Sequence, residues 1–342
     1  MNRPLVVFLI ICILAGSCFE EDQRVLPYPG QVSGITDSVQ TNLSYFDFEN
    51  GSVVRTVPVK SWQLGFECGA AGWHIVTNSG ASWFIYNTGQ QDPNTQMTMP
   101  QGVDHLYDVP SAFPDSTAVG DWVTGTGSHH IYTGHVYLLG YFQGGAFSKV
   151  KKVIFQSVND TAYRFFYKEM DTGESDTMII LKNDSVNYVY FNFRQYQQVD
   201  LEPDKTSWDL AFGPYYDRAT LFGMTIPYLV GGSFLNTWDT EAVIDSVNRF
   251  DDIDAGMVQD YEFRRQRDIP GYRWKGVTVD ITGGGIATYA VKSNYNYIFH
   301  TAHGNYFKLR FLSYTQDGRS GFPQFEFQKL ELTKGTFHHQ KE

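Results

Sequence analysis

The sequence predicts an all-β protein with few short helices, and three observations lead to this class. Short runs of alternating Tyr, Phe, Val and Ile are separated by Gly, Asn and Asp turns. Aromatic residues make up 16% of the chain, and flat rings pack well on a pleated sheet. No stretch shows a sustained helical period. Only residues 240–258, with apolar side chains at Ala242, Val243, Ile244 and Val247, are compatible with a short helix.

The first eighteen residues predict a lipoprotein signal. An apolar run over residues 5–14 follows Arg3 and is too short to span a membrane as a stable helix. Small residues then lead to a cysteine in the order Leu14-Ala15-Gly16-Ser17-Cys18, which looks like a bacterial lipobox. We therefore expect a signal peptide over residues 1–17 and a lipid on the Cys18 sulfur. The alternative is an ordinary signal peptide that contains a cysteine.

Residues 18–42 are polar, contain Pro27 and Pro29, and are predicted to form a flexible tether. Three acids at residues 20–22 resemble the export signal that sends Bacteroidetes lipoproteins to the outer face of the outer membrane. We therefore expect a lipid-anchored, surface-exposed protein of the outer membrane. The alternative is that the three acids are only solvated charges in a soluble tether. Loss of Cys12 and lipidation of Cys18 leave Cys68 as the last thiol, so no internal disulfide is expected.

Charge and motifs exclude several classes of function. The net charge is −11 and no basic run occurs, so nucleic acid is not an expected partner. The sequence contains no G-x-x-x-x-G-K-[ST], H-E-x-x-H or G-x-S-x-G motif. With no catalytic constellation visible, we do not expect an enzyme.

Two sets of motifs recur along the chain. Residues 45–48 (YFDF) are echoed by residues 190–193 (YFNF) at an offset of 190 − 45 = 145. The pattern Trp-x-Leu-x-Phe at residues 62–66 recurs at residues 208–212, at an offset of 208 − 62 = 146. We predict two divergent copies of one β module, with coincidence of common β patterns as the alternative. The predicted divisions are a first module over 43–170, a connector over 171–187, a second module over 188–334 and a tail over 335–342.

The order of these motifs resembles the HmuY-like haem-binding lipoproteins of Bacteroidetes. The first copy carries Tyr45-Phe46-x-Phe48, Trp62-x-Leu64-x-Phe66 and residues 73–80, in which His74 is expected on the solvent face of a strand. The second copy carries residues 208–212 and a family-like ending over 297–323. The resemblance implies a surface protein that captures haem or a related porphyrin for iron acquisition. It also implies transfer of that haem to an outer-membrane TonB-dependent receptor.

The resemblance also implies paired His or paired Met ligands, because haem iron takes imidazole or thioether donors on opposite faces of the ring. Met97 stands where the first ligand loop of the family falls, and His129 follows Trp122 much as the second ligand follows its own Trp. Met97 and His129 are therefore the expected axial ligands, although a mixed pair departs from the matched pairs of the family. The alternative ligands are Met99, His105 and His130.

Other interpretations of the same residues stay open. Loop methionines also fill gaps in cores, and adjacent His129 and His130 in a strand would face opposite sides. The second copy has no histidine between Trp208 and His300, so it is expected to be structural or to bind something else. Aromatic side chains also stack on sugars. The alternative function is therefore a non-enzymatic glycan- or protein-binding surface lipoprotein that has lost haem ligation.

Overall fold

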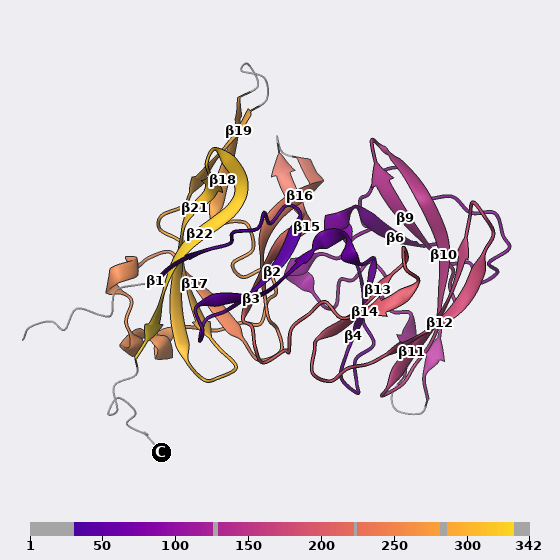
Figure 1. Ribbon diagram of the computed structural model, residues 1–342, viewed down its shortest axis with the longest axis horizontal. Helices are drawn as coiled ribbons and strands as arrows, with labels where there is room; N and C mark the ends of the chain where they lie inside the picture. The colour runs from indigo at the N-terminus through magenta and orange to yellow at the C-terminus, as the bar shows by residue number, and fades with distance from the viewer. Residues whose placement is uncertain (1–30, 126–128, 222–223, 281–285, 332–342) are drawn as a thin grey trace, which may run out of the picture. The chain divides into compact units, whose positions relative to one another are not determined.

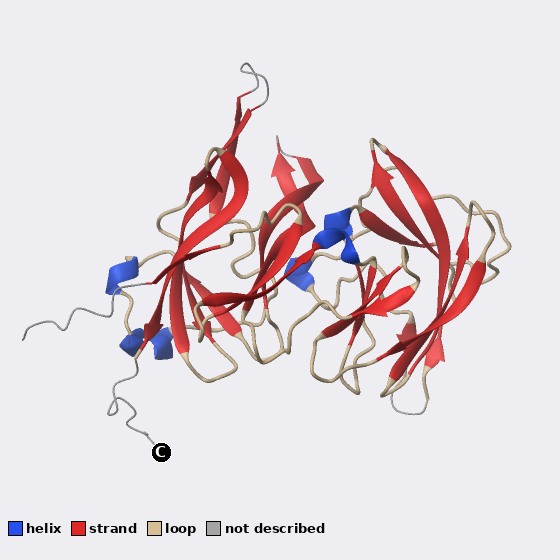
Figure 2. Cartoon of the chain, viewed as in Figure 1, coloured by secondary structure: helices blue, strands red, loops and turns tan. Residues whose placement is uncertain are grey.

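The structure, a computed structural model, describes residues 31–125, 129–221, 224–280 and 286–331, and these belong to one compact unit. Strands dominate the described residues, and the helices among them are short 3-10 segments (Figure 2). The prediction of an all-β protein is thereby confirmed. The predicted signal peptide, Cys18 and the predicted tail lie outside the described residues. Of the predicted tether, only residues 31–42 are described. No helix in the described ranges is both long and apolar enough to span a membrane.

Two antiparallel sheets form what we call the first sandwich (Figure 1). The larger has the order β12-β11-β10-β9-β6 and the smaller the order β14-β13-β4-β5. The strands are β4 (Leu64–Glu67), β5 (Ile75–Thr77), β6 (Trp83–Asn87), β9 (Tyr137–Gln143), β10 (Ala146–Val158), β11 (Ala162–Glu169), β12 (Ser175–Leu181), β13 (Tyr188–Asn192) and β14 (Gln197–Val199). Their facing apolar side chains make one core, which includes Phe66 and Phe191 from the smaller sheet and Phe155 and Phe165 from the larger.

A second pair of antiparallel sheets forms the second sandwich, with the orders β1-β22-β21-β20-β17 and β16-β15-β2-β3. Its strands are β1 (Gln31–Gly34), β2 (Asn42–Asp47), β3 (Ser52–Pro58), β15 (Leu210–Leu221), β16 (Met224–Leu235), β17 (Glu241–Asp245), β20 (Asn296–His300), β21 (Tyr306–Gln316) and β22 (Arg319–Leu330). Phe46 and Phe212 from one sheet pack against Phe325 from the other in its core. Aromatic pairs of this kind add to the stabilisation that apolar burial supplies.

The remaining elements are short. Two hairpins stand apart from the large sheets, one formed by β7 (Val123–Thr124) with β8 (Ile131–Tyr132) and one by β18 (Lys275–Asp280) with β19 (Ile286–Val291). The 3-10 helices are η1 (Val59–Ser61), η2 (Ser79–Ala81), η3 (Pro110–Ala112), η4 (Phe250–Asp252) and η5 (Ala255–Asp260). The short helix that the sequence allows around residues 242–247 does not form: residues 241–245 form β17 at the edge of a sheet, and the 3-10 helices η4 and η5 follow.

Strands of the two predicted modules are exchanged between the sandwiches. The first YFDF strand, β2, pairs with the strand that follows Trp208 in the second copy, β15, with Tyr45 opposite Ala211. The second YFNF strand, β13, pairs with the strand that follows Trp62 in the first copy, β4, with Tyr190 opposite Gly65. Each sandwich therefore joins strands that lie about half a chain apart in the sequence. The division into modules over 43–170 and 188–334 describes the repeat in the sequence and stays a prediction.

Residues 31–42 differ from the expected flexible tether. Residues Gln31–Gly34 form β1, which pairs antiparallel with β22. Ile35 and Val39 are 2% and 0% exposed and belong to the core of the second sandwich. Because these two apolar side chains are buried and β1 is paired along a sheet edge, this part of the chain belongs to the folded unit.

Candidate functional site

A methionine-lined hollow of about 520 Å³ lies beside the larger sheet of the first sandwich. Three of the seven methionines of the chain line it. Two come from the long segment between β6 and η3, and one follows the last residue of β11. We call this cavity the methionine hollow, and its lining is Met97, Thr98, Met99, Pro100, Gln101, Gly102, Gly145, Ala146, Phe147, Val150 and Met170.

A buried lysine holds the segment that carries the first two methionines. Successive residues of a strand point to opposite faces, so Lys151 and Lys152 of β10 point to different sides of the sheet. The Lys152 ammonium group donates hydrogen bonds to the carbonyl oxygens of Pro93 and Thr95, at 2.6 and 2.7 Å. Burial lowers the pKa of Lys152. These two bonds fix the segment against the sheet only a few residues before Met97.

The three thioethers differ in their surroundings. Met97 is 7% exposed and packs on Val136 and Leu138, so it also fills part of a small core. Met99 packs on the same side of the sheet, where a Cβ built on Gly140 would lie 3.4 Å from its terminal methyl carbon. Met170 is 42% exposed, and its backbone N–H donates to the carbonyl of Val150 at 3.1 Å. Sequence reasoning missed Met170, because nothing in the sequence brings the end of β11 to the loop of Met97.

The two predicted axial ligands are not brought together. His129 is exposed beside the β7–β8 hairpin, and His130 Nδ1 lies 3.2 Å from the carbonyl oxygen of Val158, the last residue of β10. Val150, which lines the methionine hollow, is eight residues earlier in β10. A rise of about 3.3 Å per residue separates these ends of the strand by roughly 25 Å. Neither histidine lines the hollow with Met97.

His105, another alternative ligand, is also placed elsewhere. Its φ of 62° lies in the left-handed region, and its side chain is 70% exposed. Arg218 Nη2 lies 2.6 Å from its Nδ1, and Asp104 Oδ2 lies 3.3 Å from its Nε2. His105 is therefore part of a surface charge network. Among the described residues, no group of three or more His, Cys, Asp or Glu side chains gathers as at a metal site.

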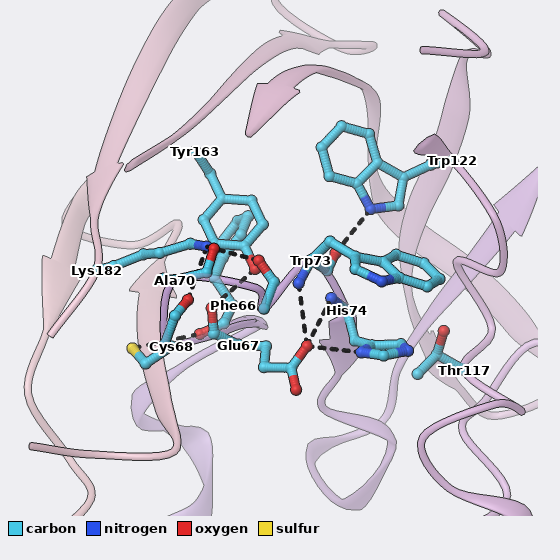
Figure 3. Close-up of polar contacts among 12 residues, drawn as sticks. Phe66, Glu67, Cys68, Ala70, Trp73, His74, Thr117, Trp122, Tyr163 and Lys182 are labelled. Atoms are coloured by element: carbon cyan, nitrogen blue, oxygen red, sulfur yellow. Dashed lines mark hydrogen bonds and ion pairs between the residues drawn. The ribbon is translucent and has the colours of Figure 1, made fainter. Parts of the chain in front are cut away.

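A polar cluster fixes the hairpin that carries His129 (Figure 3). The indole N–H of Trp122 donates to the carbonyl of Trp73 at 2.9 Å. The Glu67 carboxylate accepts from the backbone N–H groups of Trp73 and His74 and lies 2.6 Å from His74 Nδ1. Burial alone would raise the pKa of Glu67, but the bonds from His74 and Trp73 outweigh it and hold the pKa below its usual value.

The expectation that His74 lies on a solvent face is therefore wrong. Its side chain is only 14% exposed. The strand β5 begins at Ile75, so the alternation of faces along a strand does not extend to this residue.

A second cleft, of about 230 Å³, lies where β16 meets the β18–β19 hairpin. Four tyrosines line it together with Lys275, whose ammonium group donates to the carbonyl of Gly231 at 2.6 Å. Burial lowers the pKa of Lys275 to about 7. We call it the tyrosine cleft, and the four rings are those of Tyr228, Tyr272, Tyr289 and Tyr314. Its lining contains no histidine or methionine.

The fold and the hollow define a β-sheet protein with soft sulfur donors in an open cavity that has both polar and apolar walls. The family model described as HmuY protein matches residues 184–327 of the chain. The resemblance to the HmuY-like family is confirmed by this match. The matched residues do not reach the first predicted module, so the tandem duplication stays a prediction.

Solved structures are similar to the chain at low identity. An apo HmuY analog from Tannerella forsythia is 9% identical, with a TM-score of 0.23, over 89% of this chain and 96% of that one. A putative HmuY-like heme binding protein from Bacteroides vulgatus is 16% identical, with a TM-score of 0.16, over 52% and 90%. Apo PinO from Porphyromonas gingivitis is 12% identical, with a TM-score of 0.17, over 53% and 96%. No curated protein matches the chain.

Proposed function

We propose that this protein is a surface-exposed lipoprotein that binds haem or a related porphyrin for iron acquisition, without catalysing a reaction. The observation that carries the proposal is the convergence of Met97, Met99 and Met170 on one hollow of about 520 Å³. Thioether sulfur is an established axial donor to haem iron, and the side chains of Phe147 and Val150 in the lining offer apolar contact to the flat face of a porphyrin. The HmuY match over residues 184–327 supports the same function.

The packing favours one pair of ligands. Met97 and Met99 both lie against the same face of the larger sheet, near Leu138 and Gly140. A haem iron needs its two donors on opposite faces of the ring, so the second donor has to come from another element. Met170 follows β11 and supplies such a donor. The proposal therefore keeps Met97 from the predicted pair and places Met170, rather than His129, as its partner.

Haemin titration followed by the Soret absorbance tests this site. The double variant Met97→Leu, Met170→Leu removes both sulfurs with little change in volume, and we expect its affinity to fall at least about tenfold, which is about 1.4 kcal/mol. The variant Met178→Leu, in β12 and outside the hollow, is the matched control and should bind as the native protein does. His129→Ala should also leave the affinity unchanged.

Two outcomes would contradict or relocate the site. No shifted absorbance at micromolar haemin would reject haem binding and favour the glycan- or protein-binding alternative, which a glycan array then examines. Unchanged binding in the methionine variant, with loss in Tyr228→Phe, Tyr289→Phe, would move the site to the tyrosine cleft. This is a real competitor because nearly all of its lining falls within the matched residues.

The lipid anchor at Cys18 is part of the proposal, together with an outer-membrane TonB-dependent receptor that takes over the haem. In cells that process bacterial lipoproteins, Cys18→Ser should abolish incorporation of labelled palmitate and release the protein from the membrane fraction. Two acyl signals anchor a protein stably, whereas their loss leaves little affinity for the bilayer. Retention of both label and membrane association in this variant would reject the anchor. Cys12→Ser is the matched control and should be processed normally.

A further inference from the structure

A third cavity, of about 90 Å³, lies between elements of both sandwiches and shares no lining residue with the methionine hollow. Eight of its twenty-four lining residues are aromatic. The residues that matter for its chemistry are Tyr45, Trp62, Phe113, Trp208, Phe234 and Arg267. We call it the Arg267 cavity. Nothing in the proposed haem site uses it.

Arg267 brings a positive charge to these aromatic walls. Its guanidinium carbon lies 4.4 Å from the ring centre of Phe113 and 4.6 Å from that of Phe234. Its backbone carbonyl accepts a hydrogen bond from Leu235, which fixes the residue against β16. No carboxylate of the described residues forms an ion pair with its guanidinium. A planar guanidinium in apolar surroundings is the group that best binds a carboxylate through two parallel hydrogen bonds.

The two acids that also line the cavity are already engaged. Asp108 accepts the backbone N–H groups of Thr77 and Ala118, at 2.8 Å each. Glu202 accepts from the backbone and side-chain amides of Asn187 and from the backbone of Tyr188, at 2.7–3.2 Å. Burial raises the pKa of Glu202 to about 7 and that of Asp108 to about 6. Neither carboxylate forms an ion pair with the guanidinium group of Arg267.

Two residues that line the cavity carry buried polar atoms without a hydrogen-bond partner. Trp208 is 8% exposed, and its indole N–H is buried without a hydrogen-bond partner. Tyr215 also lines the cavity, and its hydroxyl group is likewise buried and unpartnered. A buried donor without a partner costs about 1–3 kcal/mol, so native proteins rarely leave one unsatisfied. Donors of this kind are suited to the oxygen atoms of an anion.

We propose that the Arg267 cavity binds a small carboxylic acid with a flat apolar body, whose carboxylate pairs with Arg267 and whose body lies among the aromatic walls. A single water needs about 10–15 Å³ by this measure of volume, so the cavity has room for a ring-sized molecule but not for a porphyrin. The site gives the protein a second ligand that differs from haem in size and charge.

Calorimetric titration of the purified protein with benzoate tests this site, with benzyl alcohol as the uncharged analogue. We expect benzoate to bind and benzyl alcohol to bind at least about tenfold more weakly, because the alcohol lacks the charge-assisted pair of bonds. Arg267→Met should weaken benzoate at least about tenfold and make the two ligands similar. Trp208→Phe, which removes one donor but keeps a ring, should weaken benzoate by about threefold. Arg264→Met, at a residue whose side chain is 61% exposed and lies outside the cavity, is the matched control.

Two results would overturn the proposal: no benzoate binding at millimolar concentration, or equal benzoate affinity in the native protein and Arg267→Met. The thermal transition shows whether Arg267→Met folds. If it does not, two other measurements test the proposal: the comparison of benzoate with benzyl alcohol in the native protein, and the titration of Trp208→Phe. Haemin titration of the same variants separates this site from the methionine hollow. Loss of benzoate with intact haem binding is the pattern expected for Arg267→Met.

Discussion

Replacing Lys151 with methionine is expected to lower the free energy of unfolding by about 3–5 kcal/mol, because it leaves a buried carboxylate without its charge partner. Lys151 and Glu169 lie opposite each other on β10 and β11, and their side chains are each only 7% exposed. Lys151 Nζ donates to Glu169 Oε2 at 2.9 Å, and the Tyr196 hydroxyl donates to the other oxygen at 3.0 Å. Urea denaturation measures the loss.

The pair itself is expected to contribute much less than this loss. Taking two charges out of water costs nearly as much as their attraction returns, so Lys151→Met, Glu169→Leu should recover most of the stability. The control is Arg265→Met, which breaks the exposed pairs of Arg265 with Asp239 and Glu241 and should cost at most about 1 kcal/mol. A loss below about 1 kcal/mol in Lys151→Met would contradict the buried-pair account.

The class of fold is predictable from the sequence because local patterns decide it. Alternation of apolar residues with period two gives β2, β4, β13 and β15 almost at the positions expected. The partner of each strand is not predictable in this way. The strands around Tyr45 and Tyr190 present nearly the same pattern, so either suits the edge of β4 or β15, and contacts spread over the whole chain decide which pairing forms.

The same limit applies to the candidate sites, because local patterns do not show which distant residues meet in the fold. The sequence singles out Met97 because a thioether in a loop is a soft donor, and the structure places it in a cavity. Met170 and Arg267 carry no local signal, because each acquires its role only when distant strands come together. The position of His129 after Trp122 predicts a place beside Met97. The sequence does not reveal that the stretch of β10 from Val150 to Val158 separates the histidines from the methionine hollow.

The exchange of strands has a consequence for ligand binding. The Arg267 cavity takes Tyr45 from β2, Tyr190 from β13 and Trp208 from the segment before β15, so its walls come from both predicted copies. The methionine hollow uses residues of the first predicted module alone. A ligand in the Arg267 cavity is therefore expected to stabilise both sandwiches against unfolding, whereas haem in the hollow contacts only the first.

Glu202 is expected to make the protein less stable as the pH rises from about 4.5 to about 7. Burial raises the pKa of this carboxyl from 4.5 to about 7 in the folded chain. Between these two pH values the folded state keeps the proton and the unfolded state releases it, so raising the pH favours unfolding. A difference of about 2.5 pKa units corresponds to about 3 kcal/mol in the free energy of unfolding. This contribution is present in full below pH 4.5 and is lost above pH 7.

Glu202→Gln removes this titration. Between pH 4.5 and 7.5 the free energy of unfolding of the variant should therefore fall by about 3 kcal/mol less than that of the native protein. Urea denaturation at several pH values measures both slopes, and the comparison of slopes cancels the cost of the altered hydrogen bonds to Asn187 and Tyr188. Glu174→Gln, at an exposed residue, should keep the native slope. Parallel pH profiles for the native protein and Glu202→Gln would mean that the four hydrogen bonds to Glu202 hold it ionised in the folded state, despite its burial.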